Sequence, residues 1–309
     1  MFRLALLFLS LGLIAALAFG FLGALHPAFD TFAHFRWHLA LGLLALGIVA
    51  LILRIPRAPL ILLVFAALGI WQSGADNRIG EPGAGAARAG NAGYSLLSFN
   101  LRFDNPDRSA VVAMILATDA DILTLSETSR LWQDALETLD DRYPYRFHCP
   151  EWSRIGGTMT FSKFPIREDG QFCADYAAYS KAVVEIGGRP VSLGNVHLRW
   201  PWPASGPRQV RVLQGELGTI GEDALVAGDF NATVWSDTAA RFARFAGLQI
   251  ARGYGGTWMH KLLSADLAPV LGLPIDLVMH KGVVEIRSVR TLPAIGSDHL
   301  PLLVEFDLQ

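Results

Sequence analysis

Residues 224–231 read ALVAGDFN, and this stretch carries the pattern that decides the fold. Four small or branched apolar residues are followed at once by Gly228, Asp229 and, after one aromatic residue, Asn231. A short apolar run of this kind predicts a buried strand. A carboxylate and an amide then stand at the end of that strand, where they are suited to bind a metal ion or a phosphate.

The same arrangement, an apolar strand that ends in polar side chains, recurs along the chain. Each case alone also fits a helix cap, a turn or a structural histidine. Their repetition favours a shared site over unrelated caps. The further segments are Ser98-Phe99-Asn100, Leu125-Ser126-Glu127, Gly194-Asn195-Val196-His197 and Gly296-Ser297-Asp298-His299, together with Asp276 in Pro274-Ile275-Asp276-Leu277-Val278.

These residue types match the needs of phosphate ester hydrolysis. A hard cation prefers carboxylate and amide oxygens as ligands. The reaction also needs a base that activates water, donors for the developing negative charge and an acid for the leaving oxygen. The chain lacks a thiolate-rich zinc site, a P-loop and a G-x-S-x-G elbow. The set therefore indicates metal-assisted chemistry at phosphorus.

The motifs SFNLR, LSETS, NVHL, GDFN, PIDLV and GSDHLP occur in an order that resembles the endonuclease/exonuclease/phosphatase family. The resemblance runs from Tyr94 to Phe306, and GDFN and GSDHLP carry most of its specificity. It implies a four-layer α/β sandwich of two mixed β-sheets flanked by helices, with the site between the sheets. It also implies Mg²⁺ or Mn²⁺ as the cofactor. The N-terminal arrangement described below looks like a membrane-anchored bacterial branch.

The resemblance also implies which residues bind the metal ion, the attacking water and the phosphate. By motif position, Asn100 and Glu127 would bind the divalent metal, with Asp298 nearby. Asp229 would orient or deprotonate the attacking water, and Asn231 would hold the phosphate.

The remaining three residues would handle protons. Asp276 would polarise His299, which would act as a base or as a phosphate ligand. His197 would be the general acid or another phosphate ligand. Two positions depart from the family pattern: Ser126 stands where many members have Gln before the metal-binding Glu, and Leu277 stands where related membrane-anchored members often place His. Neither departure removes a metal ligand, but both blur the assignment of a substrate.

Hydrophobic periodicity alone supports an α/β sandwich. Strands alternate with helices early in the 94–309 region and crowd together in its middle. The predicted strands cover 94–101, 121–126, 158–161, 182–186, 191–196, 224–227, 275–279, 283–289 and 302–306, and the predicted helices lie around 111–115, 131–139, 209–217 and 238–245.

The first 72 residues predict a membrane anchor with spans at about 4–25, 37–53 and 59–72. The first run has no charged residue over 22 positions, about 33 Å as a helix. The third run is short, and a buried or interfacial helix is the alternative there. A cleaved signal peptide is the rival interpretation of residues 1–25, but its apolar core would be too long and two more apolar runs follow. Residues 73–93 predict a flexible Gly/Ala-rich linker to a catalytic domain at 94–309.

Charge placement predicts the topology of these spans. Arg3 precedes the first span, and Arg54 and Arg57 lie between the second and third. The positive-inside rule then places the N-terminus and the turn at Arg54–Arg57 in the cytoplasm. With three spans the catalytic domain is expected outside the cytoplasm, in the periplasm of a Gram-negative host, with the anchor in the inner membrane.

Charge and cysteine content bear on the substrate class and on the compartment of the protein. Residues 91–309 hold 20 Lys and Arg against 25 Asp and Glu, a balance of −5 that disfavours long DNA as a substrate. The only cysteines, Cys149 and Cys173, are either two unrelated thiols or a disulfide, and an oxidising location favours the disulfide.

The sequence thus predicts a membrane-anchored phosphodiesterase or phosphatase. Its substrate would be a phospholipid headgroup, a nucleotide or a nucleic acid, and no obligate protein partner is inferred. Four tryptophans near the motifs, Trp200, Trp202, Trp235 and Trp258, would contact lipid or bases, or belong to the core. The alternative function is a non-catalytic, membrane-tethered binding module on the same fold.

Overall fold

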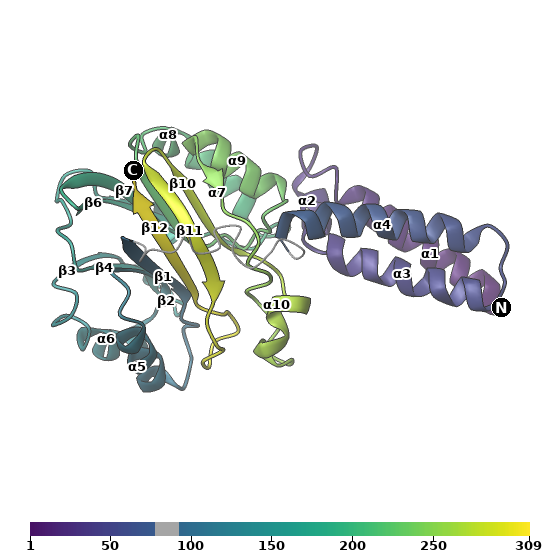
Figure 1. Ribbon diagram of the computed structural model, residues 1–309, viewed down its shortest axis with the longest axis horizontal. Helices are drawn as coiled ribbons and strands as arrows, with labels where there is room; N and C mark the ends of the chain where they lie inside the picture. The colour runs from purple at the N-terminus through teal and green to yellow at the C-terminus, as the bar shows by residue number, and fades with distance from the viewer. Residues whose placement is uncertain (78–92) are drawn as a thin grey trace.

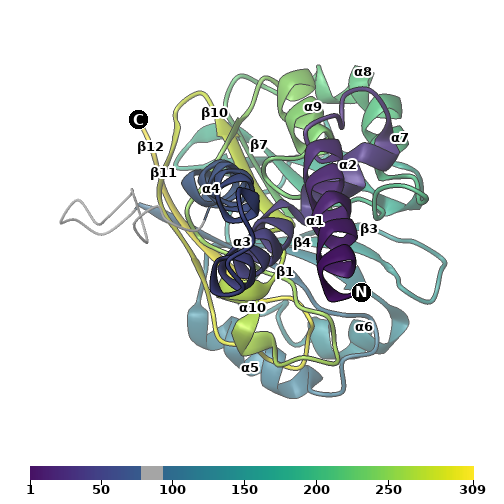
Figure 2. The same ribbon diagram turned by 90° about the vertical axis from the view of Figure 1, so that its right-hand side faces the viewer.

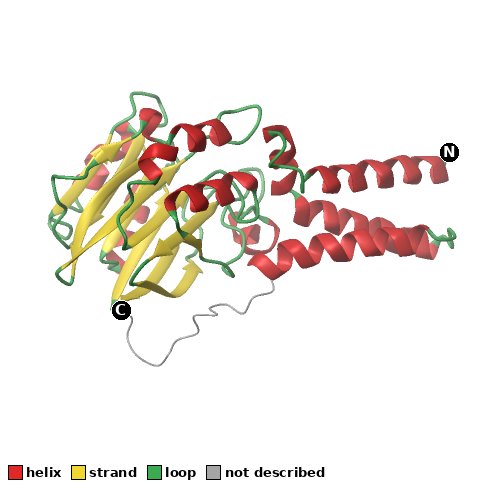
Figure 3. Cartoon of the chain, turned by 90° about the horizontal axis from the view of Figure 1, so that it is seen from above, coloured by secondary structure: helices red, strands yellow, loops and turns green. Residues whose placement is uncertain are grey.

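The computed structural model describes residues 1–77 and 93–309. Two β-sheets stack against each other, and a group of N-terminal helices projects from one end of the stack (Figure 1). Helices lie outside the sheets in the view from above (Figure 3). The predicted α/β sandwich of two mixed sheets with helices is confirmed.

The first sheet has the strand order β11-β12-β1-β2-β4-β3 and mixes parallel and antiparallel pairs. Its central strands β1 and β2 are mostly buried, as expected for strands covered on both faces. The strands are β1 (Tyr94–Asn100), β2 (Ile122–Thr128), β3 (Tyr145–Cys149), β4 (Gly157–Ser162), β11 (Val284–Thr291) and β12 (Leu302–Leu308).

The second sheet has the order β5-β6-β7-β8-β10-β9. Its strands β7 and β8 are parallel, and the other pairs are antiparallel. The strands are β5 (Phe172–Cys173), β6 (Tyr179–Ile186), β7 (Arg189–His197), β8 (Ala224–Asp229), β9 (Gln249–Ile250) and β10 (Asp276–Lys281).

Three apolar clusters fill the spaces between these layers. One lies between the two sheets and includes Leu96, Val184, Leu225 and Phe306. A second packs helices α5 (Arg108–Thr118) and α6 (Arg130–Glu137) on the first sheet. The third packs α7 (Gly206–Val212), α8 (Gln214–Leu217) and α9 (Asp237–Ala246) on the second sheet. Short helical turns η1 (Asp175–Ala177), η2 (Ala265–Leu267) and α10 (Ala268–Leu271) lie in the connections.

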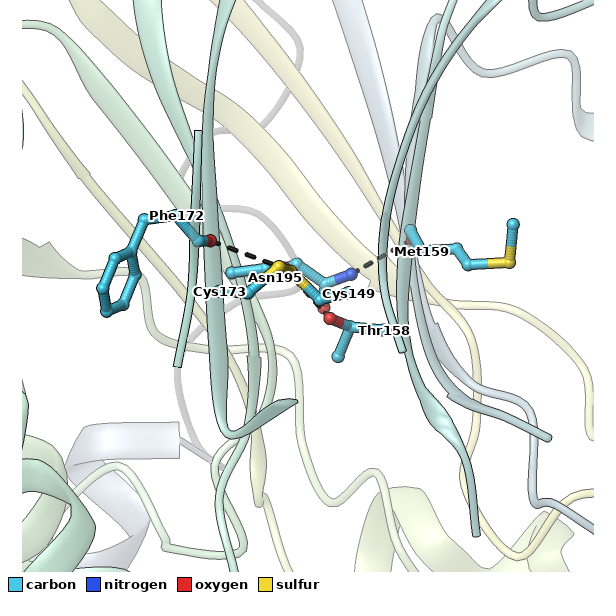
Figure 4. Close-up of a disulfide and its surroundings, with 7 residues drawn as sticks. Cys149, Thr158, Met159, Phe172, Cys173 and Asn195 are labelled. Carbon is cyan, nitrogen blue, oxygen red and sulfur yellow. Dashed lines mark hydrogen bonds between the residues drawn. A yellow bond between two sulfur atoms is a disulfide. The ribbon is translucent and has the colours of Figure 1, made fainter. Parts of the chain in front are cut away.

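A disulfide joins the two sheets at their edges. Cys149 ends the edge strand β3, Cys173 ends β5, and their Cα atoms are 5.6 Å apart. Beside it, the amide nitrogen of Asn195 donates to the carbonyl of Met159 across the inter-sheet space at 3.1 Å (Figure 4). The same nitrogen donates to the carbonyl of Leu125, also at 3.1 Å. The disulfide therefore links an edge strand of one sheet covalently to an edge strand of the other.

Some predicted elements differ from the structure. The helix expected at 209–217 is two helices, α7 and α8, with Leu213 between them. The edge strands β3, β5 and β9 were not predicted. Residues 145–149 read YRFHC, which has no apolar run, and the other two strands are two residues long. Pairing with a neighbour creates such strands, so their own sequence carries little signal.

The N-terminal region forms four helices, α1 (Phe2–Phe19), α2 (Pro27–His34), α3 (Arg36–Ile52) and α4 (Ala58–Asn77). The run predicted as a span at 4–25 is helical only to Phe19, and a second helix begins at Pro27, where the His26 imidazole caps the amide of Ala28. The predicted linker at 73–93 begins inside α4, and its residues 78–92 lie outside the described residues.

Helices α1, α3 and α4 lie side by side, as the view along their axes shows (Figure 2). Leu17, Leu43 and Leu62 are among the buried residues of their shared core. Within the described residues, no single helix has both the length and the apolar character needed to cross a bilayer. By length and composition alone, the pair α2 and α3, bent by 61°, meets that requirement.

Candidate active site

Strand pairing brings the predicted site residues to one end of the sandwich. In the second sheet, Asp229 at the end of β8 is level with His197 on β7 and with Asp276 on β10. In the first sheet, Asn100 at the end of β1 is level with Ser126, next to Glu127 on β2. The ends of both sheets therefore present polar side chains to a common space.

Two backbone irregularities aim the side chains of this space. Gly228 has φ 147°, and a Cβ atom at that position would lie 2.2 Å from the carbonyl oxygen of Val196, so the turn before Asp229 requires glycine. Glu127 lies in a break in the β2–β4 register and has φ 58°. Such bulges are frequent beside active sites, where they redirect a side chain.

Asp276 and His299 form a tight pair. The imidazole Nδ1 of His299 is 2.9 and 3.0 Å from the two carboxylate oxygens of Asp276. Its other nitrogen, Nε2, is 3.7 Å from Oδ2 of Asp229. With Nδ1 held by a carboxylate, His299 presents Nε2 to the site in a fixed orientation.

Hydroxyl groups hold this pair in place. The backbone N–H of His299 donates to Oγ of Ser297 at 3.1 Å, and that hydroxyl donates to the carbonyl oxygen of Asn100 at 2.8 Å. The backbone N–H of Asp276 donates to Oγ1 of Thr257 at 3.1 Å. The two sheets are thus linked through the site itself.

Burial makes the electrostatics of the site strong. Burial disfavours the charged form of His299, but the carboxylates of Asp276 and Asp229 outweigh it and raise its pKa to about 10. Burial raises the pKa of Asp229 to about 7, against the opposing pull of His299. Burial also lowers the pKa of His197, which Glu127 opposes. Positive charge therefore concentrates on His299, between two carboxyl groups.

The amide of Asn100 lies between two carboxylates. Its Nδ2 donates to Oε1 of Glu127 at 3.1 Å and to Oδ2 of Asp229 at 3.0 Å. Its Oδ1 accepts from the backbone N–H of Arg102 at 3.0 Å. The second oxygen of Glu127 accepts from the N–H of Phe103 at 2.8 Å. To bind a metal ion, Asn100 would have to present Oδ1 in place of Nδ2.

Asn231 and His197 complete the site. The backbone N–H of Asn231 donates to Oδ1 of Asp229 at 2.7 Å, and its amide donates to Oδ2 of Asp229 and to the carbonyl of Leu198. His197 ends β7, with Nε2 3.7 Å from Oε1 of Glu127. Both residues border the space between Asp229 and Glu127.

The donor set fits a hard divalent cation. Ligand atoms of Asp229, Asp276 and His299 lie within 4.8 Å of one another, and all three residues are buried. The oxygens of Glu127 border the same space, and Asn100 would add Oδ1 if its amide turned. Most of the set is oxygen, as Mg²⁺ or Mn²⁺ prefers.

Two of the three predicted metal ligands lie together in the structure, and the third does not. It brings Asn100 and Glu127 into direct contact, with Asp229 as their common neighbour. Asp298, by contrast, bonds through Oδ2 to the indole N–H of Trp258 at 3.1 Å and is outside the Asp229–Asp276–His299 group.

Sequence reasoning missed the supporting groups Thr257 and Ser297. The serine lies inside the quoted GSDH segment, which was a usable signal. Thr257 is isolated between glycine and tryptophan, where no pattern marked it.

A two-sheet α/β sandwich with a buried Asp/Asp/His group at its end defines a metal-dependent phosphoesterase. The family model for the endonuclease/exonuclease/phosphatase family matches residues 97–299. The chain belongs to this family.

One curated sequence relative matches part of the chain. A UPF0294 protein of Erwinia tasmaniensis is 34% identical over 110 residues, which cover 32% of this chain and 37% of that relative. The chain therefore matches little more than a third of the length of this curated relative.

Among solved structures, an endonuclease/exonuclease/phosphatase from Bacteroides vulgatus superposes with a TM-score of 0.57 at 18% identity, over 70% of this chain and 99% of that one. A beta toxin variant from Staphylococcus aureus, with bound magnesium ions, has a TM-score of 0.55 at 13% identity, over 69% of this chain and 99% of that one. At these identities the likeness shows the fold.

Proposed function

We propose that the protein is a membrane-anchored, Mg²⁺- or Mn²⁺-dependent hydrolase of phosphoesters. One observation carries the proposal: the Asp276–His299 pair points at Asp229 across 3.7 Å, beside Glu127 and Asn100. The group contains acidic ligands, a fixed imidazole and a carboxyl group next to an amide. These are the parts that metal-assisted attack of water on phosphorus requires.

The residues divide the work as follows. Asp229, already held by two hydrogen bonds from Asn231, orients the attacking water or takes its proton. His299 offers Nε2 to a phosphate oxygen while Asp276 fixes its tautomer. His197 lies beside Glu127, where it donates to the leaving oxygen or to the phosphate. Asn231 borders the phosphate position.

Glu127 and Asn100 would hold the metal ion, with Asp298 close by. When bound, such an ion neutralises charge that develops on the phosphate oxygens. The magnesium ions in the beta toxin structure support this choice of metal.

Membrane anchoring is supported by the surface of the N-terminal helices. Large apolar side chains face outward on α1, α3 and α4, including Phe8, Ile52, Leu60 and Trp71, at 65, 73, 71 and 65% exposure. Extended apolar surface of this kind marks contact with a membrane or a partner. The disulfide fits an oxidising compartment, as expected for a periplasmic domain.

A phosphoester at the lipid surface is the substrate that the site's surroundings favour. The loops that follow β7 and β8 contact helix α2 through Trp202 and Trp235. Residues 262–271 expose several apolar side chains and are tied to α3, because Nε2 of His38 donates to the carbonyl of Leu271 at 2.7 Å. The exposed residues are Leu262, Leu263, Leu267, Val270 and Leu271. An acidic domain with an apolar rim suits a phospholipid headgroup better than a long nucleic acid.

Hydrolysis of bis-p-nitrophenyl phosphate by the full chain in detergent tests the proposal. Activity should require Mg²⁺ or Mn²⁺, vanish with EDTA and return when metal is restored. Phospholipid vesicles, nucleotides and duplex DNA then form a substrate panel, in which phospholipid should be cleaved fastest. An inactive but folded chain under every metal would favour the non-catalytic binding module.

The topology is tested by reporter fusions at the C-terminus. A fused alkaline phosphatase should be active and a fused green fluorescent protein dark, because three spans place the C-terminus outside the cytoplasm. A fusion at residue 55, in the basic turn, should show the opposite pattern. A fluorescent C-terminal fusion would contradict the three-span anchor.

A further inference from the structure

Helix α2 of the N-terminal region packs directly on the catalytic domain. Thr31 Oγ1 donates to the carbonyl of Trp202 at 2.9 Å, and the indole N–H of Trp235 donates to the carbonyl of Ala33 at 2.7 Å. The linker between α4 and β1 is therefore not the only connection between the two regions. Figures 1 and 2 show α2 at the junction, next to α9 and α7.

The centre of this contact is the carboxylate of Asp30, which is 1% exposed. Its Oδ1 accepts from the backbone N–H of Asp237 at 2.7 Å. Its Oδ2 accepts from the backbone N–H of Thr238 at 3.0 Å and from the Thr238 hydroxyl at 2.6 Å. More than 200 residues of chain separate Asp30 from these partners.

Asp30 completes the N-terminus of α9, which lacks part of its own cap. The Ser236 hydroxyl accepts from the N–H of Ala239, and the N–H of Ser236 donates to the carbonyl of Thr233. Only the N–H groups of Asp237 and Thr238 are left, and Asp30 binds both. A carboxylate at this position also interacts favourably with the helix dipole.

The fit around Asp30 is close. A Cβ atom on Gly23 would lie 2.7 Å from Oδ1 of Asp30 and 3.2 Å from Cβ of Asp237. Glycine at position 23 thus allows the chain after α1 to lie close to both acidic residues. The side chain of Arg241 pairs with Asp237 and donates to the carbonyl of Ala24, so it also joins the two regions.

The first turn of α9, which Asp30 caps, is connected to the site by a short loop. Residues 230–236 connect Asp229 at the end of β8 to the first turn of α9. This loop contains Asn231, whose backbone is in the left-handed conformation with φ 47° and whose N–H and amide orient Asp229. Asparagine tolerates this conformation, and hydrogen bonds to Asp229 and to the carbonyl of Leu198 fix Asn231 in it.

A second set of contacts connects α2 to Asp298, the residue before His299 in the sequence. The ring of His34, which is fully buried, lies 5.6 Å from the ring of Trp200, and Trp200 lies 6.1 Å from Trp258. Trp258 in turn donates to Asp298. This row of aromatic rings connects helix α2 to Trp258, which pairs with His299 in an isolated β-bridge.

We infer that Asp30 is a positioning residue for the catalytic loop 229–236, and that the N-terminal helices are part of the catalytic apparatus as well as an anchor. The inference rests on the proposed phosphoesterase function. It predicts that loss of the Asp30 carboxylate weakens turnover even though Asp30 never touches the substrate.

The test compares Asp30→Asn with the wild-type full chain in detergent. Asn keeps the size but replaces one acceptor oxygen with a donor that faces the N–H groups of α9. We expect kcat on bis-p-nitrophenyl phosphate to fall by about 10- to 100-fold, since small misplacements of catalytic groups carry losses of that order. KM for this small substrate should change little. Hydrogen exchange measured by mass spectrometry should become faster in peptides covering 229–246.

Two variants serve as controls. Asp169→Asn removes an exposed carboxylate that pairs with Arg167 and should match wild type in rate and exchange. Thr238→Val removes one of the three hydrogen bonds to Asp30 and should give an intermediate loss of kcat.

A folded Asp30→Asn protein with wild-type kcat would overturn the inference, even if its melting temperature fell. If the wild-type chain proves inactive with every metal, the proposed function fails. The role of Asp30 in holding the loop is then tested by hydrogen exchange alone, compared between wild type and Asp30→Asn. Unchanged exchange in 229–236 would overturn the inference in that case, whereas faster exchange there would support it.

Discussion

Replacing His299 with alanine should lower turnover by on the order of 10²–10⁴, the range that a positioned acid or base contributes. The imidazole is the only group in the described part of the site that both contacts Asp276 through Nδ1 and faces Asp229 through Nε2. Its loss would leave two buried carboxyl groups without the cation between them. The circular dichroism spectrum and the melting curve of the variant should show that the fold is retained.

Asp276→Asn should lose much of what His299→Ala loses, because the amide can no longer accept from Nδ1–H through both oxygens. The pair acts as a unit, so the double variant should be little worse than the worse single one. The measurement is kcat/KM for all four proteins on one substrate at one metal concentration. Losses that add in free energy would contradict the pairing, and near-normal turnover in both His197→Ala and His299→Ala would contradict the mechanism.

The strand-end motifs were predictable because their signals are local. A buried strand needs an apolar run, and a polar residue directly after it, as in GDFN, stands out against that run. The order of these motifs along the chain matches a known family, and the two-sheet sandwich was predicted from that resemblance. The composition of the space between the sheets, with Leu96 and Leu225 on facing strands, agrees with that expectation.

The geometry inside the site was not predictable in the same way. Nothing in the letters LSETS indicates that Glu127 occupies a bulge with φ 58°, since the bulge arises from the pairing of β2 with β4. The position of Asp298 beside Trp258 depends on a loop 40 residues away in the chain. Side-chain orientation set by distant segments carries no local pattern.

The role of the N-terminal region shows the same limit more clearly. Hydrophobicity predicted apolar helices there, and the predicted spans at 4–25 and 37–53 leave Asp30 and His34 in the loop between them. The structure makes Asp30 the cap of α9 and buries His34 completely. A charged residue in a short loop looks the same in the sequence whether it faces water or a helix terminus. Only the fold distinguishes the two cases.

Replacing Glu127 with glutamine should weaken metal binding, with activity partly restored at high Mg²⁺. The substitution keeps the size of the side chain and removes one negative charge from an oxygen-rich site. We expect the Mg²⁺ concentration for half-maximal activity to rise by at least about tenfold, which is about 1.4 kcal/mol of binding free energy. In the structure both oxygens of Glu127 accept hydrogen bonds, from Asn100 and from the N–H of Phe103, so the amide of Gln would also turn a donor toward one of these donors.

Metal binding can be followed without turnover, by the increase in melting temperature with added Mg²⁺, since a ligand that binds only the native state stabilises it. The increase should appear at higher Mg²⁺ in Glu127→Gln than in wild type. Glu168→Gln, an exposed change of the same kind, should leave both the activity curve and the melting curve in place. Full activity of Glu127→Gln at low Mg²⁺ would show that this carboxylate does not bind the metal ion.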